Sequence, residues 1–271
     1  MRFLPWGRCR KGFNELLHSY SFIGHSAEFL NLHHTCMDAS TQLAAYFKSH
    51  PDVAGKVADF NADADRLFHL DLTAGNKELD KTIVSNPEKL DKWVFGKLAD
   101  NGCKYGIGGY MENRTIYAGI PLFDNGVDEP RFLHLGVDIW AAAGTAIYAP
   151  LPGKIHSFND NNNHGDYGPT IILEHDLDGL LLYSLYGHLS RKDLKGLRVD
   201  DPIGINQKIG SFGAIAENGH WPPHLHFQLM FDMEGQQGDY PGACRFSEKE
   251  KYLKNIPDPQ LILQFPKAVN A

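Results

Sequence analysis

The sequence predicts an α+β protein, with an antiparallel β-sheet or barrel-like domain preceded by a mainly helical N-terminal region. Up to about residue 103, apolar residues recur at helical spacing and are bounded by helix-capping residues. From residue 104 the chain changes to short β-rich runs separated by Gly, Pro, Asn and Asp. We therefore expect a helical region at 1–103, a β domain at 104–235, and a C-terminal extension at 236–271 that packs back on the domain.

Two helices are expected in the first region. One follows Ser26 and ends before Pro51, because the residue before a proline avoids the helical conformation. The other is marked by Asn86 as N-cap, by Pro87 at the first helical position and by Gly102 beyond the end.

Strands are expected in five runs of the second region, TAIYA, KIHSF, PTIILEH, LLLYSLYGHL and HLHFQLM. The linkers PLPG and DLDG between them are typical of turns. The Asn-rich segment 159–166 is expected to be a loop, and the last apolar stretch, LILQF, is expected to pack against the domain.

Composition limits the classes of function. The net charge of -7 and the pI near 6.0 argue against nucleic acid and anionic membrane surfaces as partners, because both are negatively charged. The sequence has no run of about 18 apolar residues and no apolar core of a secretory signal, so we expect a cytoplasmic protein. The four cysteines lack Cys-x-x-Cys spacing, so we do not expect them to ligate a metal.

Histidine and aspartate stand close together at two places in the β region. His224 and His226 alternate in a predicted strand and therefore share one face. His134 precedes Asp138 by four residues, which on a straight strand would place them about 13 Å apart, too far for one shared ion. A bend at Gly136, which has the backbone freedom for it, would bring the two side chains together.

His188 closes a third segment, and these positions together have the composition of a catalytic zinc site. Such a site has three protein ligands, an open position for water and nearby groups for proton transfer. Spacing alone does not assign the roles. The other histidines are expected to be ordinary surface or core groups, and the His33–His34 pair points in different directions on a presumed helix. His220 is a weaker candidate for shaping the cleft. The ordinary group comprises His18, His25, His50, His69, His156, His164 and His175.

Four segments in order resemble the signature of lysostaphin-type zinc metallopeptidases, namely HLGVD, GTAIYAPLPGKI, YGHLS and HLHF. Over about 68–264 the chain resembles an intracellular branch of that family, found fused to aminotransferases and phosphotransferase-like kinases. EPRFLHLGVDIW, YGHLSRKDLKGLRV and NGHWPPHLHFQLM carry this closer likeness. One segment, VDDPIGINQKIG, departs from the family's second glycine-rich pattern, which alters a loop and not a ligand.

The resemblance implies that zinc is held by His134, Asp138 and His226. It places His188 and His224 beside a zinc-activated water, as general base and as donor to the developing oxyanion. We expect His224 to be the base, with the reverse assignment open. Tyr186, close to His188, is a further candidate for supporting the site, against an ordinary core aromatic.

The implied function is zinc-dependent hydrolysis of a peptide or amide bond, as in a metalloendopeptidase. Because most relatives cut peptide bridges of the bacterial cell wall, and a cytoplasmic protein cannot reach them, the substrate stays open among a peptide, a muropeptide and a small amide. The alternative is a non-catalytic metal-binding module that regulates or serves as a scaffold. A purely structural zinc is disfavoured, since such sites are usually closed by four ligands rich in cysteine. The sequence indicates neither the oligomeric state nor the role of residues 1–103.

Overall fold

The computed structural model describes residues 37–263 and 265. Its main sheet has eight strands: β1 (Leu67–His69), β2 (Tyr105–Gly108), β4 (Val137–Trp140), β6 (Gly153–Asn161), β7 (Gly168–Leu177), β8 (Leu180–Gly187), β9 (Pro202–Ile203) and β11 (His224–Met230). Two small sheets pair β5 (Ala146–Tyr148) with β10 (Lys208–Ser211), and β3 (Leu133–His134) with β12 (Ala243–Cys244).

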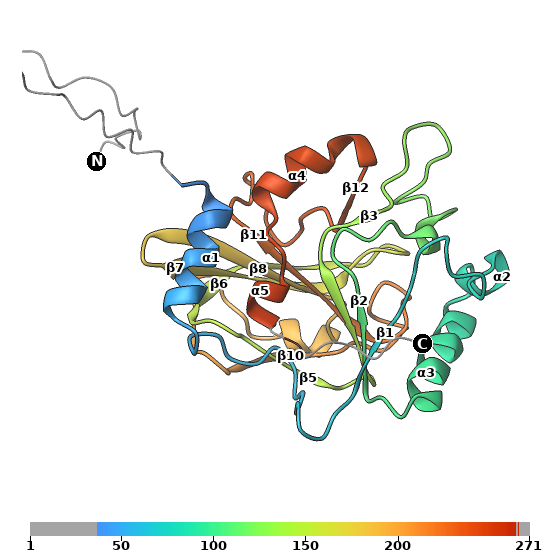
Figure 1. The fold of residues 1–271 in the computed structure, drawn as a ribbon, viewed down its shortest axis with the longest axis horizontal. Helices are drawn as coiled ribbons and strands as arrows, with labels where there is room; N and C mark the ends of the chain where they lie inside the picture. The colour runs from blue at the N-terminus through green and yellow to red at the C-terminus, as the bar shows by residue number, and fades with distance from the viewer. Residues whose placement is uncertain (1–36, 264, 266–271) are drawn as a thin grey trace, which may run out of the picture. The chain divides into compact units, whose positions relative to one another are not determined.

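The main sheet has the order β1-β2-β4-β11-β8-β7-β6-β9. Figure 1 labels β1, β2, β11, β8, β7 and β6 of this sheet. All neighbours are antiparallel except β1 and β2, which run parallel. Within the described residues this sheet is open, with β1 at one end and β9 at the other. The α+β class and the antiparallel sheet are therefore confirmed, whereas the barrel-like closure is not observed.

The five predicted strands are all present, but β6 is longer than KIHSF. It continues to Asn161, so the first three residues of the predicted loop 159–166 belong to a strand. The buried Asn161 side chain donates hydrogen bonds to Thr170 Oγ1 at 3.1 Å and to the Gly238 carbonyl at 2.9 Å. These bonds explain how a polar residue lies inside a strand, because a buried amide is tolerated when it is hydrogen-bonded.

The described helices are α1 (Ala39–Ser49), α2 (Lys81–Val84), α3 (Pro87–Asp100), α4 (Lys249–Asn255) and α5 (Gln260–Leu263). The prediction for α3 is confirmed, since the Asn86 side chain accepts a hydrogen bond from the Lys89 amide and Pro87 opens the helix. The first predicted helix ends before Pro51, as expected, but the segment after Ser26 lies outside the described residues up to 36. Between α1 and α2 the chain also forms β1, so residues 37–103 are only partly helical.

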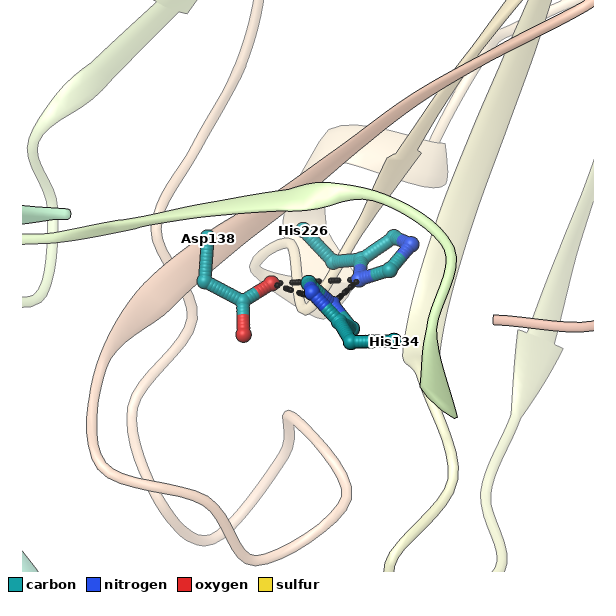
Figure 2. A group of neighbouring side chains, drawn as sticks. All are labelled: His134, Asp138 and His226. Carbon is teal, nitrogen blue, oxygen red and sulfur yellow. Dashed lines mark hydrogen bonds and ion pairs between the residues drawn. The ribbon is translucent and has the colours of Figure 1, made fainter. Parts of the chain in front are cut away.

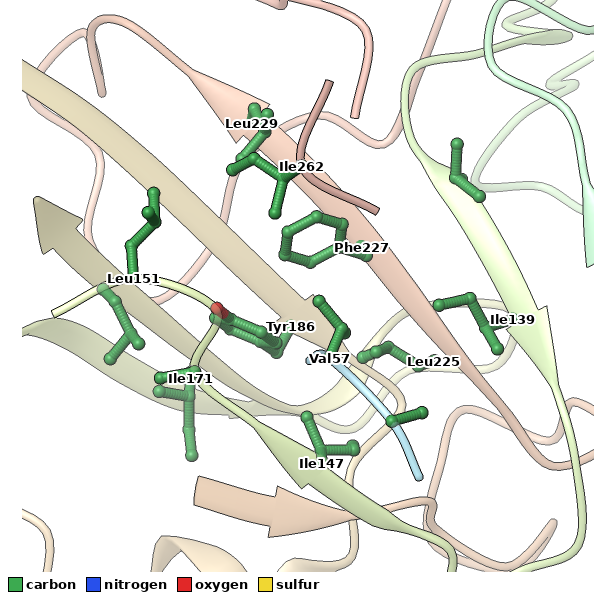
Figure 3. Close-up of a cluster of buried hydrophobic side chains, with 14 of the residues drawn as sticks. Val57, Ile139, Ile147, Leu151, Ile171, Tyr186, Leu225, Phe227, Leu229 and Ile262 are labelled. Atoms are coloured by element: carbon green, nitrogen blue, oxygen red, sulfur yellow. The ribbon is translucent and has the colours of Figure 1, made fainter. Parts of the chain in front are cut away.

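Elements from before and after residue 103 share one hydrophobic core (Figure 3). Leu43 of α1 and Val57 pack with Ile139 of β4 and Phe227 of β11, and Ile262 of α5 joins the same cluster. The last apolar stretch therefore packs against this core. The domain boundary at residue 103 stays a prediction.

A second apolar cluster connects α3 to the part of the sheet that carries the site. Leu90 and Val94 of α3 pack in a cluster that includes Trp140 of β4 and Trp221, three residues before β11. Within the part of the chain that the structure describes, no helix is long and apolar enough to cross a membrane.

Candidate metal centre

Three side chains from three strands point toward one another at the centre of the site (Figure 2). His134 Nε2 lies 2.9 Å from His226 Nδ1, and Asp138 Oδ1 lies 3.2 Å from the first nitrogen and 3.1 Å from the second. Ligands about 2.0–2.1 Å from a tetrahedral zinc ion are separated by roughly 3.3 Å. The triangle of candidate donors therefore has the size and the chemistry that a zinc ion requires.

Strand pairing brings the three donors together. His226 is the direct partner of Asp138 across the β11–β4 ladder, and β3 ends at His134, just before β4 begins at Val137. The chain therefore bends between His134 and Asp138, as the sequence predicted, instead of running straight for four residues.

The role of Gly136 differs from the predicted one. Its φ lies outside the left-handed region, so the bend does not depend on backbone freedom unique to glycine. A Cβ at this position would instead lie 2.6 Å from Nε2 and Cε1 of His226 and 2.8 Å from the Phe227 carbonyl oxygen. Glycine is needed because the imidazole of His226 packs directly against the backbone.

Hydrogen bonds fix which nitrogen of each candidate ligand is free to bind a cation. His134 Nδ1 lies 2.9 Å from the Gly109 carbonyl, which can only accept, so this nitrogen carries the proton and Nε2 carries the lone pair. His226 Nε2 donates to Gln228 Oε1 at 3.0 Å, and Gln228 Nε2 donates to the Pro241 carbonyl, which sets the orientation of the amide. The free lone pairs of both histidines consequently point into the donor triangle.

Arg114 pairs with the carboxylate of Asp138 through the oxygen that does not face the two histidines. This buried guanidinium donates from Nη1 to Asp138 Oδ2 and to the Tyr117 hydroxyl, and from Nε to Glu112 at 2.8 Å. Burial alone would raise the pKa of Asp138, but Arg114 and the neighbouring imidazoles hold that pKa well below its usual value. Oδ2 is thereby occupied, and Oδ1 remains available to a cation.

Burial also keeps His134 neutral. Together with the positive charge of Arg114, burial lowers the pKa of His134 to about 3. At neutral pH this imidazole and the ionised Asp138 are therefore in the protonation states that metal ligation demands.

His188 and His224 form a second pair of imidazoles at the same cleft, with ring centroids 4.1 Å apart. Nδ1 of His188 donates to the Asn218 carbonyl at 2.8 Å, and Nδ1 of His224 donates to the Pro222 carbonyl at 2.7 Å. The Trp140 indole stacks on His224 at 4.1 Å. Both Nε2 atoms therefore carry lone pairs, and within the described residues neither has a hydrogen-bond partner.

Both of these imidazoles are neutral at physiological pH. Burial, reinforced by the neighbouring His224, lowers the pKa of His188 well below its usual value, and burial lowers the pKa of His224 to about 4. In this tautomer each Nε2 can accept a proton, and only after accepting one can it donate to a developing oxyanion.

Several residues at the site were not found from the sequence. Arg114 and Gly109 stand outside every recognised motif, and Tyr167, whose hydroxyl lies 3.4 Å from His226 Nε2, follows the predicted loop. Tyr186 does not support the site. It packs against Phe227 in the hydrophobic core, on the face of the sheet opposite to the cluster.

An open cleft of about 140 Å³ leads to the cluster. Asp138, His188, His224 and His226 form its floor, and Tyr117, Phe123 and Trp221 contribute aromatic walls. Substrate-sized groups can therefore approach the candidate donors from one side.

Residues 132–239 match the model of peptidase family M23. The matched segment is less than half of the chain and contains the three candidate ligands and both further imidazoles, whereas Arg114 and Gly109 lie before it. The match supports a metallopeptidase of the lysostaphin-type M23 family for this part of the chain.

Solved structures are similar over parts of the chain. The catalytic domain of the antimicrobial peptidase lysostaphin from Staphylococcus simulans is 28% identical and covers 45% of this chain and 80% of that domain, with a TM-score of 0.32. A zinc containing peptidase from Vibrio cholerae is 25% identical and covers 36% of this chain and 27% of its own length, with a TM-score of 0.30. A search of curated protein sequences found no match.

Proposed function

We propose that this protein is a zinc-dependent hydrolase that cleaves a peptide or amide bond. The observation that carries the proposal is the convergence of three ligand lone pairs beside a cleft lined by two further imidazoles, whose Nε2 atoms accept no hydrogen bond from the described residues. His134, Asp138 and His226 would hold the ion. A zinc ion bound there would polarise a carbonyl oxygen and lower the pKa of a water toward about 7.

His224 and His188 would handle protons beside the scissile bond. Because His224 is neutral and its Nε2 is free, it can take the proton of the attacking water and later deliver it to the leaving amine. His188, 4.1 Å away between ring centroids, would take the second proton of the attacking water on Nε2, donate a hydrogen bond from there to the oxyanion, and release this proton to the amine product. The reverse assignment uses the same contacts and stays open.

The proposal is tested by separating metal binding from turnover. His226→Ala and Asp138→Ala are expected to lose bound zinc, measured by elemental analysis of the purified protein. His188→Gln and His224→Gln are expected to keep zinc and to lose activity by about 10²–10⁴-fold, the usual contribution of a general acid or base. His69→Gln, at an exposed position on β1, is the matched control.

Substrates for this experiment are glycine-rich peptides, muropeptides and simple amides, each assayed with and without a chelator. Hydrolysis that stops with the chelator and returns with zinc would support the proposal. Full zinc occupancy in both ligand variants, or unchanged turnover in both imidazole variants, would refute the assigned roles.

A non-catalytic regulatory or scaffold module remains the alternative, and zinc binding without hydrolysis of any of these substrates would favour it. The likeness to the intracellular branch with fused aminotransferases or kinases, the cytoplasmic location and the absence of nucleic-acid and membrane partners all stay predictions.

A further inference from the structure

A second pocket, which we call the side pocket, adjoins the cleft. It has a volume of about 160 Å³, and Gly165 and Trp221 line both it and the cleft. Its outer wall comes from α2 and α3, through Lys81, Val84 and Leu90 among others. These helices lie before residues 132–239, so the outer wall comes from outside the family match, whereas Trp221 lies within it.

The side pocket combines an apolar wall with positive or neutral polar groups. Val84, Leu90 and Trp221 belong to the wall, and no Asp or Glu lines the pocket. A volume near 150 Å³ holds a group about as large as a benzene ring, so one aliphatic or aromatic side chain fits. The volume of the side pocket and its apolar wall therefore favour binding of one apolar side chain.

Lys81 supplies the charge. It is exposed on α2, and it takes part in none of the ion pairs found in the described part of the chain. The preceding Asp80 does not pair with it, because the Asp80 carboxylate caps α2 by accepting from the Ile83 amide. His164 and His220, with ring centroids 5.3 Å apart, add imidazole N–H groups that can donate hydrogen bonds. These groups complement an anion.

We propose that the side pocket binds the C-terminal residue of a short peptide, with an apolar side chain against the wall and the free α-carboxylate at Lys81. This inference rests on the proposed hydrolase function and narrows its substrate class. An internal acidic residue would satisfy Lys81 but would leave the apolar wall empty, and an internal apolar residue would leave Lys81 without an anion. A C-terminal apolar residue satisfies both requirements.

Binding is measured first, by calorimetry with N-acetyl-leucine and N-acetyl-leucinamide as probes. The acid is expected to bind at least about fivefold more tightly than the amide, since a charge-assisted hydrogen bond is stronger than a neutral one. Lys81→Gln should abolish this preference, and Lys89→Gln, an exposed lysine of α3 outside the pocket, should leave it intact. Equal binding of the two probes, absence of binding, or a preference that survives Lys81→Gln would overturn the inference.

A carboxylate could also bind the metal directly, so the titrations are repeated after chelation. Binding that persists in the chelated protein supports the side pocket, and binding that disappears with the metal overturns it. Filling the pocket with Ser85→Trp should block the acid, whereas Thr82→Trp, an exposed residue of α2 that does not line the pocket, should not.

Turnover separates this inference from the proposed function. Peptides that end in leucine are compared with the same peptides amidated at the C-terminus, and the free acids are expected to have a KM at least about fivefold lower. Chelator-sensitive hydrolysis of both forms with equal KM would contradict the side pocket and leave the hydrolase intact. Lys81-dependent binding of the acid without any hydrolysis would support the side pocket and contradict the hydrolase.

Discussion

Replacing Gly136 by alanine tests whether the site depends on the packing of one imidazole against the backbone. The added Cβ would lie 2.6 Å from Nε2 and Cε1 of His226 and 2.8 Å from the Phe227 carbonyl oxygen. Both distances are below normal contact, and one partner is main chain held in the β11–β4 ladder. The imidazole must therefore move away, which would lengthen its 3.0 Å hydrogen bond to Gln228 and shift Nδ1 from the donor triangle.

Two effects of Gly136→Ala can be measured. Overpacking of this size in a dense interior costs about 1–3 kcal/mol, so the free energy of unfolding of the metal-free protein should fall by that amount in urea titrations. Displacing an oriented ligand usually weakens metal binding by about 10–100-fold, so zinc affinity measured against a competing chelator should fall accordingly.

Gly96→Ala is the control for the added methyl group. Gly96 lies within α3, and apart from its chain neighbours and the backbone of its own helix no atom lies within 4 Å of where a Cβ would be, so alanine there should stabilise the protein by about 0.5–1 kcal/mol and leave zinc affinity unchanged. A Gly136→Ala protein that binds zinc as tightly as the parent would show that the close packing of His226 does not position it.

Three other perturbations have defined outcomes. Arg114→Met leaves the carboxylates of Asp138 and Glu112 buried without their partner, so urea unfolding of metal-free protein should show a loss of about 3–5 kcal/mol, and a loss below about 1 kcal/mol would contradict this pairing. Burial lowers the pKa of His175 to about 4 in the folded protein, below the pKa near 6.5 of the unfolded chain. The neutral imidazole therefore contributes fully to the free energy of unfolding above pH 6.5, and this contribution is lost as the pH falls toward 4. Between pH 7 and pH 5 the free energy of unfolding of the parent should therefore fall by about 2 kcal/mol more than that of His175→Gln, and equal decreases would exclude this linkage. Zinc at 100 times its dissociation constant should add about 2.7 kcal/mol to the free energy of unfolding, which is followed by thermal unfolding. A melting temperature that changes with neither zinc nor chelator would argue against the site.

Local signals in the sequence were sufficient for much of the fold. The capping residues Asn86 and Pro87 act within one turn of the helix they begin, so α3 could be predicted without tertiary information. The alternation of His224 and His226 likewise placed both side chains on one face of β11. The Asn-rich end of β6 could not be recognised, because the Asn161 amide is satisfied by Thr170 of the next strand and by the Gly238 carbonyl, which lies 77 positions away.

The candidate site was predictable where its residues form motifs and not where single residues act over long range. Arg114 contacts Asp138 across 24 positions, and the Gly109 carbonyl holds His134 across 25. Neither residue belongs to a sequence motif, because an isolated arginine or glycine does not indicate which distant residue it contacts. The side pocket depends equally on long-range packing, because Val84 of α2 packs against the cluster that contains Trp221.

The pairing of β2 with β4 has a consequence for any attempt to isolate the site. A fragment of residues 132–239 would lack β2, so the backbone amides and carbonyls of β4 beside Asp138 would lose their hydrogen-bond partners. β4 would then be an exposed edge strand, which promotes aggregation. The same cut would remove the carbonyl that holds His134 and the guanidinium that faces Asp138. Because β1 in turn pairs with β2, a fragment that keeps both strand pairings starts ahead of Leu67.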